Sequence, residues 1–130
     1  MLPKKHRLRS PAGFSVTVRS GARSGRRNVV LYALTHPETQ QSVPSRYGFI
    51  VSKAVGNAVT RNLVKRRLRA VAAESPAQDV GYDIVMRALP ASAHASWSEL
   101  SAEARSALES ARRQAARRSS AGARKGTSDG

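Results

Sequence analysis

The side chains best suited to bind a ligand lie between Lys53 and Arg69, in the run KAVGNAVTRNLVKRRLR. Six of these seventeen residues are Lys or Arg, and none is acidic. Guanidinium groups present planar donors that bind phosphate oxygens in pairs and stack on exposed bases. This segment therefore predicts a surface that binds a polyanion, and nucleic acid is the leading candidate.

The charge of the whole chain supports the same prediction. Its 130 residues hold 23 Lys and Arg against 8 Asp and Glu, which gives a formal net charge of +15. No acidic residue precedes Glu38, and none lies between Glu38 and Glu74. Because like charges on one surface repel each other, this separation of signs indicates a basic face that phosphates neutralise.

A helix from Asn57 to about Ala73 would divide this segment into two faces, with Asn57 as a capping residue. At about 100° per residue, Val64, Leu68 and Val71 fall within one arc and are expected to face the core. Like charges one turn apart on this helix repel each other, and bound phosphates would offset that repulsion. The polar arc holds Arg61, Asn62, Lys65, Arg66 and Arg69, and Arg67 flanks the apolar arc on its other side.

A second candidate surface contains Phe14, Val18 and Tyr32. The first two fall on one side of a short helix, and Tyr32 lies in an apolar strand. Aromatic faces stack on single-stranded bases with little sequence preference. These residues could line a groove with an aromatic floor, and ordinary core packing is the alternative for each of them.

The remaining pattern predicts alternating helices and strands. Ser10 and Pro11 are suited to begin a helix, and Ser96 with Glu99 forms a capping box before another. That last helix has an apolar stripe of Trp97, Leu100, Ala104, Leu108 and Ala111. Strands are expected over residues 28–34, 47–51 and 82–88, with a hairpin between the first two and a loop over residues 21–27.

These elements predict one α+β domain, in which helices cover one side of a sheet. Residues 1–9 are expected to form a basic arm, flexible or laid on the surface, and residues 10–113 the domain. Residues 114–130 are basic and rich in Gly and Ser, which predicts a disordered tail.

The sequence predicts no catalytic set and no metal site. It has no cysteine, and His6, His36 and His94 are interpreted as exposed, isolated residues of an arm, a loop and a linker. Asp79 and Asp83 are interpreted as a strand cap and a solvated charge. No apolar run has the length of a membrane span and no signal peptide is recognisable, so a cytoplasmic protein without a membrane partner is expected.

The run VSKAVGNAVTRNLVKRRLR, residues 51–69, resembles the signature of the bacterial ribonuclease P protein subunit. In that family a strand ending in Ser-Lys leads through Gly-Asn-Ala-Val into a helix with an Arg-Asn-Arg motif. RLRSPAGF (7–14), VVLYAL (29–34) and YDIVMRA (82–88) resemble the family's arm with its first helix, its first strand and its last strand. The resemblance covers residues 7 to 113.

The resemblance implies an α-β sandwich of about four strands and three helices, related to a ribosomal-protein domain, with a left-handed βαβ crossover. Most parallel crossovers are right-handed, so periodicity alone would not predict this hand. It also implies that an RNA subunit, with Mg²⁺, removes the 5′ leader of precursor tRNA. The protein, one monomer per RNA subunit, would bind that RNA through its basic helix and the leader through a cleft.

Carried over by position, the resemblance assigns two sets of site residues. The residues expected to contact the RNA subunit are Lys53, Arg61, Asn62, Lys65, Arg66 and Arg69. The residues expected to line the leader cleft are Phe14, Val18 and Tyr32. Three positions depart from the family: Leu63 replaces the second arginine of the motif, Ala54 a lysine, and Val18 a phenylalanine that can occur there. Relative to the family pattern, these changes are expected to weaken two phosphate contacts and one stacking contact.

Three other functions fit parts of the sequence. A ribosomal or general RNA-binding protein would share the charge and the basic helix. A DNA-binding module could insert that helix into the major groove, but strands flank it on both sides where a helix-turn-helix needs a second helix. A membrane-active protein would need a bulky, exposed apolar face, whereas Val64, Leu68 and Val71 are needed for the core.

Overall fold

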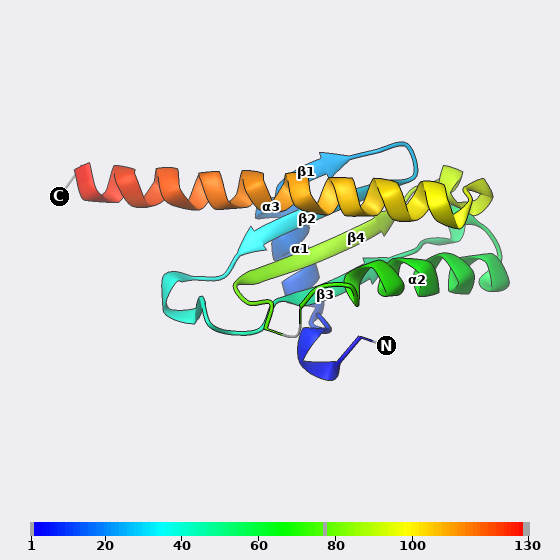
Figure 1. The fold of residues 1–130 in the computed structure, drawn as a ribbon, viewed down its shortest axis with the longest axis horizontal. Helices are drawn as coiled ribbons and strands as arrows, with labels where there is room; N and C mark the ends of the chain where they lie inside the picture. Colours follow the sequence, from blue (N-terminus) through cyan, green and yellow to red (C-terminus); the bar gives the residue numbers. More distant parts are fainter. Residues whose placement is uncertain (1, 77, 129–130) are drawn as a thin grey trace.

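The computed structural model describes residues 2–76 and 78–128, and side chains up to Ser120. Four strands form one mixed sheet in the order β1-β2-β4-β3 (Figure 1). The strands are β1 (Ala22–Gly25), β2 (Val29–Thr35), β3 (Arg46–Ile50) and β4 (Tyr82–Ala88). Strand β2 is antiparallel to β1 and β4, and β3 is parallel to β4.

Strand β2 pairs with β1 and β4 and not with β3, so the hairpin expected between β2 and β3 is wrong. The two strands pair from Val29 opposite Ala88 to Thr35 opposite Tyr82. Ile84, Val85 and Met86 are fully buried, and their uninterrupted apolar run suits a strand covered on both faces. The apolar run at residues 28–34 and the alternation within residues 47–51 identified two strands correctly, but neither pattern indicates which third strand separates them.

Strand β1 lies in a stretch that the sequence predicts to be a loop. Its residues alternate, with Ala22 and Ser24 buried and Arg23 and Gly25 exposed. Four residues are too few for this period to stand out against a composition of Gly, Arg and Ser. This strand completes the expected sheet of four.

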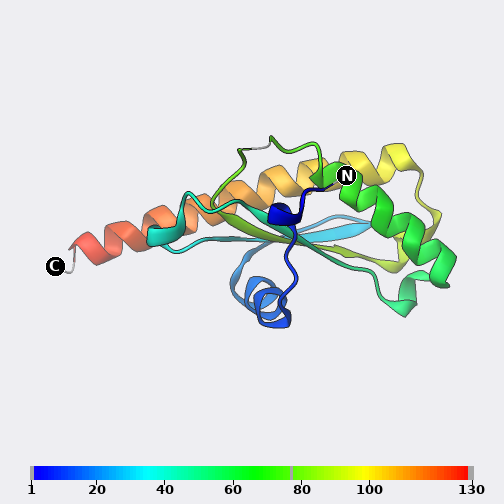
Figure 2. The ribbon, with the colours of Figure 1, turned by 90° about the horizontal axis from the view of Figure 1, so that it is seen from below.

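Three α-helices pack on the two faces of this sheet: α1 (Pro11–Ser20), α2 (Ala58–Ala72) and α3 (Trp97–Ser128). Helices α2 and α3 cover one face, and α1 lies on the other (Figure 2). The prediction that helices cover one side was therefore wrong, because α1 buries Phe14 and Val18 against Tyr32 and Val85 on the second face. Short 3-10 turns are η1 (Lys4–His6), η2 (Glu38–Gln40), η3 (Lys53–Val55) and η4 (Pro90–His94).

The β3-α2-β4 unit has the left-handed crossover that the resemblance implies. In Figure 1, β4 and its parallel neighbour β3 point to the right, α2 lies in front of the sheet, and the chain passes from β3 up to β4. A right-handed connection would pass downward in this view. The crossover brings α2 beside the outer strand β3 and leaves one side of the helix open.

The larger core fills the space between the sheet and helices α2 and α3. Val64, Leu68 and Val71 are buried there, as the helical period predicts. Helix α3 contributes Leu100 and a row of alanines whose small side chains allow close packing on β1 and β2. Trp97 does not belong to the buried stripe of α3, because this residue is 39% exposed at the first position of the helix.

Helix α3 also corrects the predicted disordered tail over residues 114–128, through which it continues without a break, whereas residues 129–130 lie outside the described part of the chain. Ala115 is 4% exposed and extends the buried row of Ala107 and Ala111 by one turn. The Gly and Ser content suggested disorder, but Ala and Arg favour helix and the packed alanine row supports the next turns.

The basic arm lies on the domain. Leu2, His6 and Leu8 are buried, and the backbone N–H of Leu8 donates to the carbonyl of Tyr47 at 2.9 Å. The ring Nδ1 of His6 lies 2.6 Å from the carbonyl oxygen of Ser45. These contacts hold the arm against β3 and against Ser45, the residue that precedes it.

The predicted cap of α2 is confirmed, since the backbone N–H of Thr60 donates to Asn57 Oδ1 at 2.9 Å. Replacing Asn57 with alanine is expected to lower the free energy of unfolding by about 1 kcal/mol, because one N–H of the first turn loses its acceptor. Asn57→Ser keeps an acceptor and is expected to restore most of that loss. Urea denaturation of both variants measures the difference, and equal losses would contradict the capping role.

Candidate nucleic-acid interface

Helix α2 presents its predicted polar arc away from the core. Asn62, Arg66 and Arg69 are exposed, and Arg61 and Lys65 are half-buried. Within the described part of the chain, the ion pairs all involve Asp79, Asp83 or Glu74, and none includes a cation of this arc. The expected set therefore shares one face whose positive charge is available to a polyanion.

Two further residues of the segment have different surroundings. Lys53, which the resemblance adds to the set, is exposed in turn η3 before the helix. Arg67 lies on the other side of α2 and donates from Nη1 to the carbonyl oxygen of Ala95 at 3.0 Å. Arg67 thus ties α2 to the turn before α3 and helps to fix the helix that carries the basic face.

The N-terminal arm and α2 enclose a basic groove, a hollow of about 200 Å³ that we call the arm groove. Its aromatic and cationic walls come from the arm, α1, β3 and α2. A second hollow, of about 320 Å³, lies beside it between Leu2 and Arg7 of the arm and Arg66 and Arg69 of α2. The arm groove is lined by Leu2, Arg7, Leu8, Arg9, Phe14, Tyr47, Phe49, Lys65 and Arg69.

This groove unites the two predicted sets of residues. Lys65 and Arg69 come from the set assigned to the RNA subunit, and Phe14 comes from the set assigned to the leader. Sequence reasoning missed Arg7, Arg9 and Phe49 as members of the site. Basic residues at positions 7 and 9 indicate an extended arm with cations along one edge. The place where the arm binds the domain could not be predicted, because it depends on contacts with residues far away in the sequence.

The three predicted cleft residues lie together on the second face of the sheet. Phe14 and Val18 of α1 are half-buried and pack against a cluster that contains Tyr32 and Val85. Tyr32 is only 7% exposed, so core packing accounts for most of its surface. Phe14 is the member of this set that also lines the arm groove.

Gly48 of β3 makes room for the ring of Phe14. A Cβ atom at this position would lie 2.5 Å from Cε1 of Phe14, far inside van der Waals contact. Gly48→Ala is expected to displace the ring and lower the free energy of unfolding by about 1–3 kcal/mol, as overpacking does. Gly25→Ala is a matched control, because the nearest atoms to a Cβ there lie 4.0 Å away. Chemical denaturation compares the two, and equal effects would contradict this packing.

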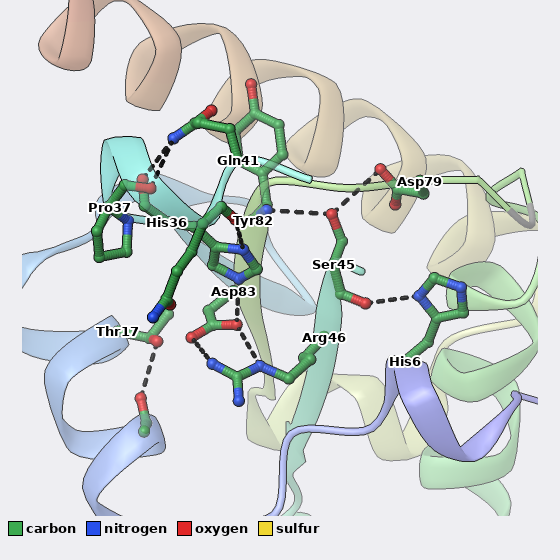
Figure 3. A network of polar contacts seen from close by, with 12 residues as sticks. His6, Thr17, His36, Pro37, Gln41, Ser45, Arg46, Asp79, Tyr82 and Asp83 are labelled. Carbon is green, nitrogen blue, oxygen red and sulfur yellow. Dashed lines mark hydrogen bonds and ion pairs between the residues drawn. The ribbon is translucent and has the colours of Figure 1, made fainter. Parts of the chain in front are cut away.

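Two buried acids anchor the frame behind the groove, which corrects the interpretation of Asp79 and Asp83 as a strand cap and a solvated charge. Asp83 binds His36 Nε2 at 2.9 Å and both Nε and Nη2 of Arg46 at 2.8 Å (Figure 3). His36 and His6 are buried, so exposure was predicted correctly only for His94. These contacts join the start of β3 to the start of β4.

The second acid, Asp79, binds three side chains at once. Its carboxylate accepts from Arg112 Nη1 of α3 at 3.0 Å, from the Tyr47 hydroxyl at 2.7 Å and from the Ser45 hydroxyl at 3.2 Å. Burial alone would raise the pKa of Asp79, but hydrogen bonds from Arg112 and Tyr47 outweigh it, and the pKa is lowered. Burial raises the pKa of Tyr47 to about 12, although the charge of Arg112 opposes this.

Carboxylates and histidines do not gather into a metal site in the described residues, where no group of three such side chains is placed to hold an ion. Among the same residues, no helix has the length and apolarity that a membrane span requires. The groups on the basic face and in the arm groove are cations, an amide and aromatic rings. Such groups bind phosphates and stack on bases.

Comparisons with known proteins agree with this chemistry. A family model described as Ribonuclease P matches residues 2–112. The ribonuclease P protein component of Kocuria rhizophila is 56% identical over 117 residues, covering 89% of this chain and 100% of that protein. The Pseudarthrobacter chlorophenolicus component is 55% identical over 128 residues, covering 98% and 92%. The RNase P protein structure from Staphylococcus aureus has a TM-score of 0.71 and 25% identity, covering 82% of this chain and 94% of that one. This chain belongs to the ribonuclease P protein family.

Proposed function

We propose that this chain is the protein subunit of ribonuclease P and assists an RNA subunit in removing the 5′ leader of precursor tRNA. The observation that carries the proposal is the arm groove, which joins the basic face of α2 to the aromatic residue Phe14. Family membership supports the same function, because the relatives that match most of this chain are named ribonuclease P protein components.

The basic face of α2 is proposed to bind the RNA subunit. Its contacts would come from Lys53, Arg61, Asn62, Lys65, Arg66 and Arg69, as the sequence predicts. Planar guanidinium groups can bind two phosphate oxygens at once, and the Asn62 amide adds a neutral donor and acceptor. Release of condensed counterions from the RNA would make this binding steeply dependent on salt.

The arm groove and the adjoining face of α1 are proposed to receive the single-stranded leader. Phe14 offers a ring for stacking on a base, and Val18 and Tyr32 support it from within. Arg7 and Arg9 of the arm line the groove together with Lys65 and Arg69 of α2, and these four cations can neutralise leader phosphates. The leader would thus pass beside the face that holds the RNA subunit.

The chemistry is proposed to belong to the RNA subunit, with Mg²⁺ held mainly by RNA. The chain's acids offer little support for a protein-borne metal site, because Asp79 and Asp83 are committed to Arg112 and Arg46. The protein would neutralise phosphates that otherwise repel one another as RNA and substrate associate. Its own residues bind and orient the leader rather than attack the phosphodiester.

One protein monomer is proposed to act with one RNA subunit, in the cytoplasm. A single α2 face and a single arm groove per chain suit a complex of one protein with one RNA and one leader. Sedimentation of the reconstituted complex measures this stoichiometry.

Cleavage of precursor tRNA by a bacterial ribonuclease P RNA at low Mg²⁺, with and without the protein, tests the proposed function. RNA alone is expected to be nearly inactive under these conditions, and the protein is expected to restore accurate 5′ cleavage. Binding to the RNA without any effect on cleavage would contradict the proposal and indicate a general RNA-binding protein. Cleavage by the protein without the RNA subunit would contradict the assignment of the chemistry.

A further inference from the structure

Helix α3 extends beyond the sheet on which it packs. Ala115 is the last buried residue among its described side chains, and residues 116–120 are all exposed. The helix continues to Ser128, and both ribbon views show its C-terminal turns passing beyond the sheet (Figures 1 and 2). We call residues 113–128 the α3 extension. At 1.5 Å per residue it is about 24 Å long.

The α3 extension carries positive charge without any acid. Residues 113–128 hold five Lys and Arg residues, Arg113, Arg117, Arg118, Arg124 and Lys125, and no Asp or Glu. Arg113 and Arg117 are exposed and lie one turn apart, where like charges destabilise a helix. After Ala115, none of the described side chains of the extension is buried, and helical turns without such packing are marginal in water. Both costs would fall if a polyanion bound this surface.

The extension begins at an anchored residue. Arg112 forms an ion pair with Asp79 and donates to the hydroxyl of Tyr47, and its guanidinium lies 5.0 Å from the centre of the Tyr82 ring. These contacts fix the direction of α3 at the point where its buried face is about to end. The extension therefore leaves the domain as a continuation of a rigid element rather than as a hinged linker.

We propose that the α3 extension is a second RNA-binding surface, which contacts the phosphate backbone of a duplex in the RNA subunit without reading its sequence. This surface lies beyond the matched family region, which ends at residue 112. Residue composition favours RNA over a bilayer, because residues 113–120 (RQAARRSS) contain no Leu, Ile, Phe or Trp to insert among lipids. The inference rests on the proposed function in naming the RNA subunit as the partner.

Salt-dependent binding of ribonuclease P RNA to the full chain tests this inference. The variants are Arg113→Gln with Arg117→Gln, the same pair changed to Lys, and a control with Arg19→Gln and Arg27→Gln. All four arginines are exposed, and the control pair lies outside both α2 and the α3 extension. Glutamine favours helix about as well as arginine, and circular dichroism checks that helix content is kept.

If both arginines contact duplex phosphates, the glutamine pair is expected to reduce the slope of log K against log salt by about 1.8, since each contact contributes about 0.9. The lysine pair is expected to keep the slope, and the control pair to change it much less. An unchanged slope in the glutamine pair, or an equal change in the control pair, would overturn the inference. Cleavage at low Mg²⁺ is measured separately. A protein that binds this RNA but does not assist cleavage would contradict the proposed function, while the salt slopes would still test the α3 extension.

Discussion

Exchanging Arg66 and Arg69 for glutamine is expected to weaken binding of the ribonuclease P RNA on the order of 100-fold. Both guanidinium groups are exposed on α2, and both line the hollow beside the arm. A hydrogen bond to a charged group contributes about 1.5–3 kcal/mol, so losing two costs at least about 3 kcal/mol. Each 1.4 kcal/mol corresponds to about a tenfold change in affinity. Equilibrium binding at fixed salt measures the loss.

The paired change of Arg19 and Arg27 to glutamine is the matched control for this loss, because it removes the same charge from exposed positions outside α2. We expect it to weaken binding far less. The α2 variant should also keep the stability of the parent protein, since neither Arg66 nor Arg69 takes part in the ion pairs of the described chain. Equal losses in the two variants would show that net charge, rather than the α2 face, determines binding.

Replacing Asp79 with asparagine is expected to lower the free energy of unfolding by about 3 kcal/mol. The change leaves the largely buried guanidinium of Arg112 without its counter-ion, and breaking one side of such a pair costs about 3–5 kcal/mol. The lower end applies because the Arg112 side chain is 25% exposed. The Tyr47 hydroxyl also loses a charged acceptor. Urea denaturation measures the loss.

The same variant should change how stability depends on pH. The pKa of Asp79 is lowered in the folded protein, from an ordinary value of 3.8, so the unfolded chain binds its proton more readily. The contribution of Asp79 is therefore complete above about pH 4 and is lost as the pH falls through the lower folded pKa. Between pH 7 and the acid range, the difference in unfolding free energy between parent and Asp79→Asn should shrink.

Glu74 provides the matched control for Asp79. It forms a two-point ion pair with Arg105, at 2.8 and 2.7 Å, but the two side chains are 45% and 51% exposed. Solvent screens such pairs, and we expect Glu74→Gln to have little effect on unfolding. If Glu74→Gln cost as much as Asp79→Asn, burial would not explain the effect of Asp79.

Helix α2 could be predicted from the sequence because its determinants are local. Asn57 supplies the cap, and the spacing of Val64, Leu68 and Val71 fixes which side is buried. Once that side is known, the polar arc follows from the helical period. The exposed position of the polar arc can therefore be predicted without any tertiary contact.

The sheet order could not be predicted in the same way. The pairing of β2 with β4 joins Val29 to Ala88 across most of the domain, and side-chain alternation within a strand does not name its partner. The left-handed crossover came from the resemblance alone, since general handedness rules favour the opposite hand.

The buried polar frame and the arm groove were also beyond local reasoning. Asp79 and Arg112 are 33 residues apart. Considered alone, each is a charged residue of the kind normally found on a solvated surface. Arg7 and Arg9 become part of a site only because the arm docks beside Lys65 and Arg69. The extended α3 was missed because its Gly and Ser content outweighed the alanine row that continues to Ala115.

Directed cross-linking tests most directly whether the protein holds two RNAs on adjoining surfaces. The chain has no cysteine, so Ala70→Cys on α2 and Ser15→Cys on α1, both at exposed positions, can each carry one short photoreactive group. In the reconstituted complex with precursor tRNA, the group on residue 70 should mark the RNA subunit and the group on residue 15 should mark the 5′ leader. If both groups marked the RNA subunit and left the leader unmarked, the proposed path of the leader beside Phe14 would be wrong.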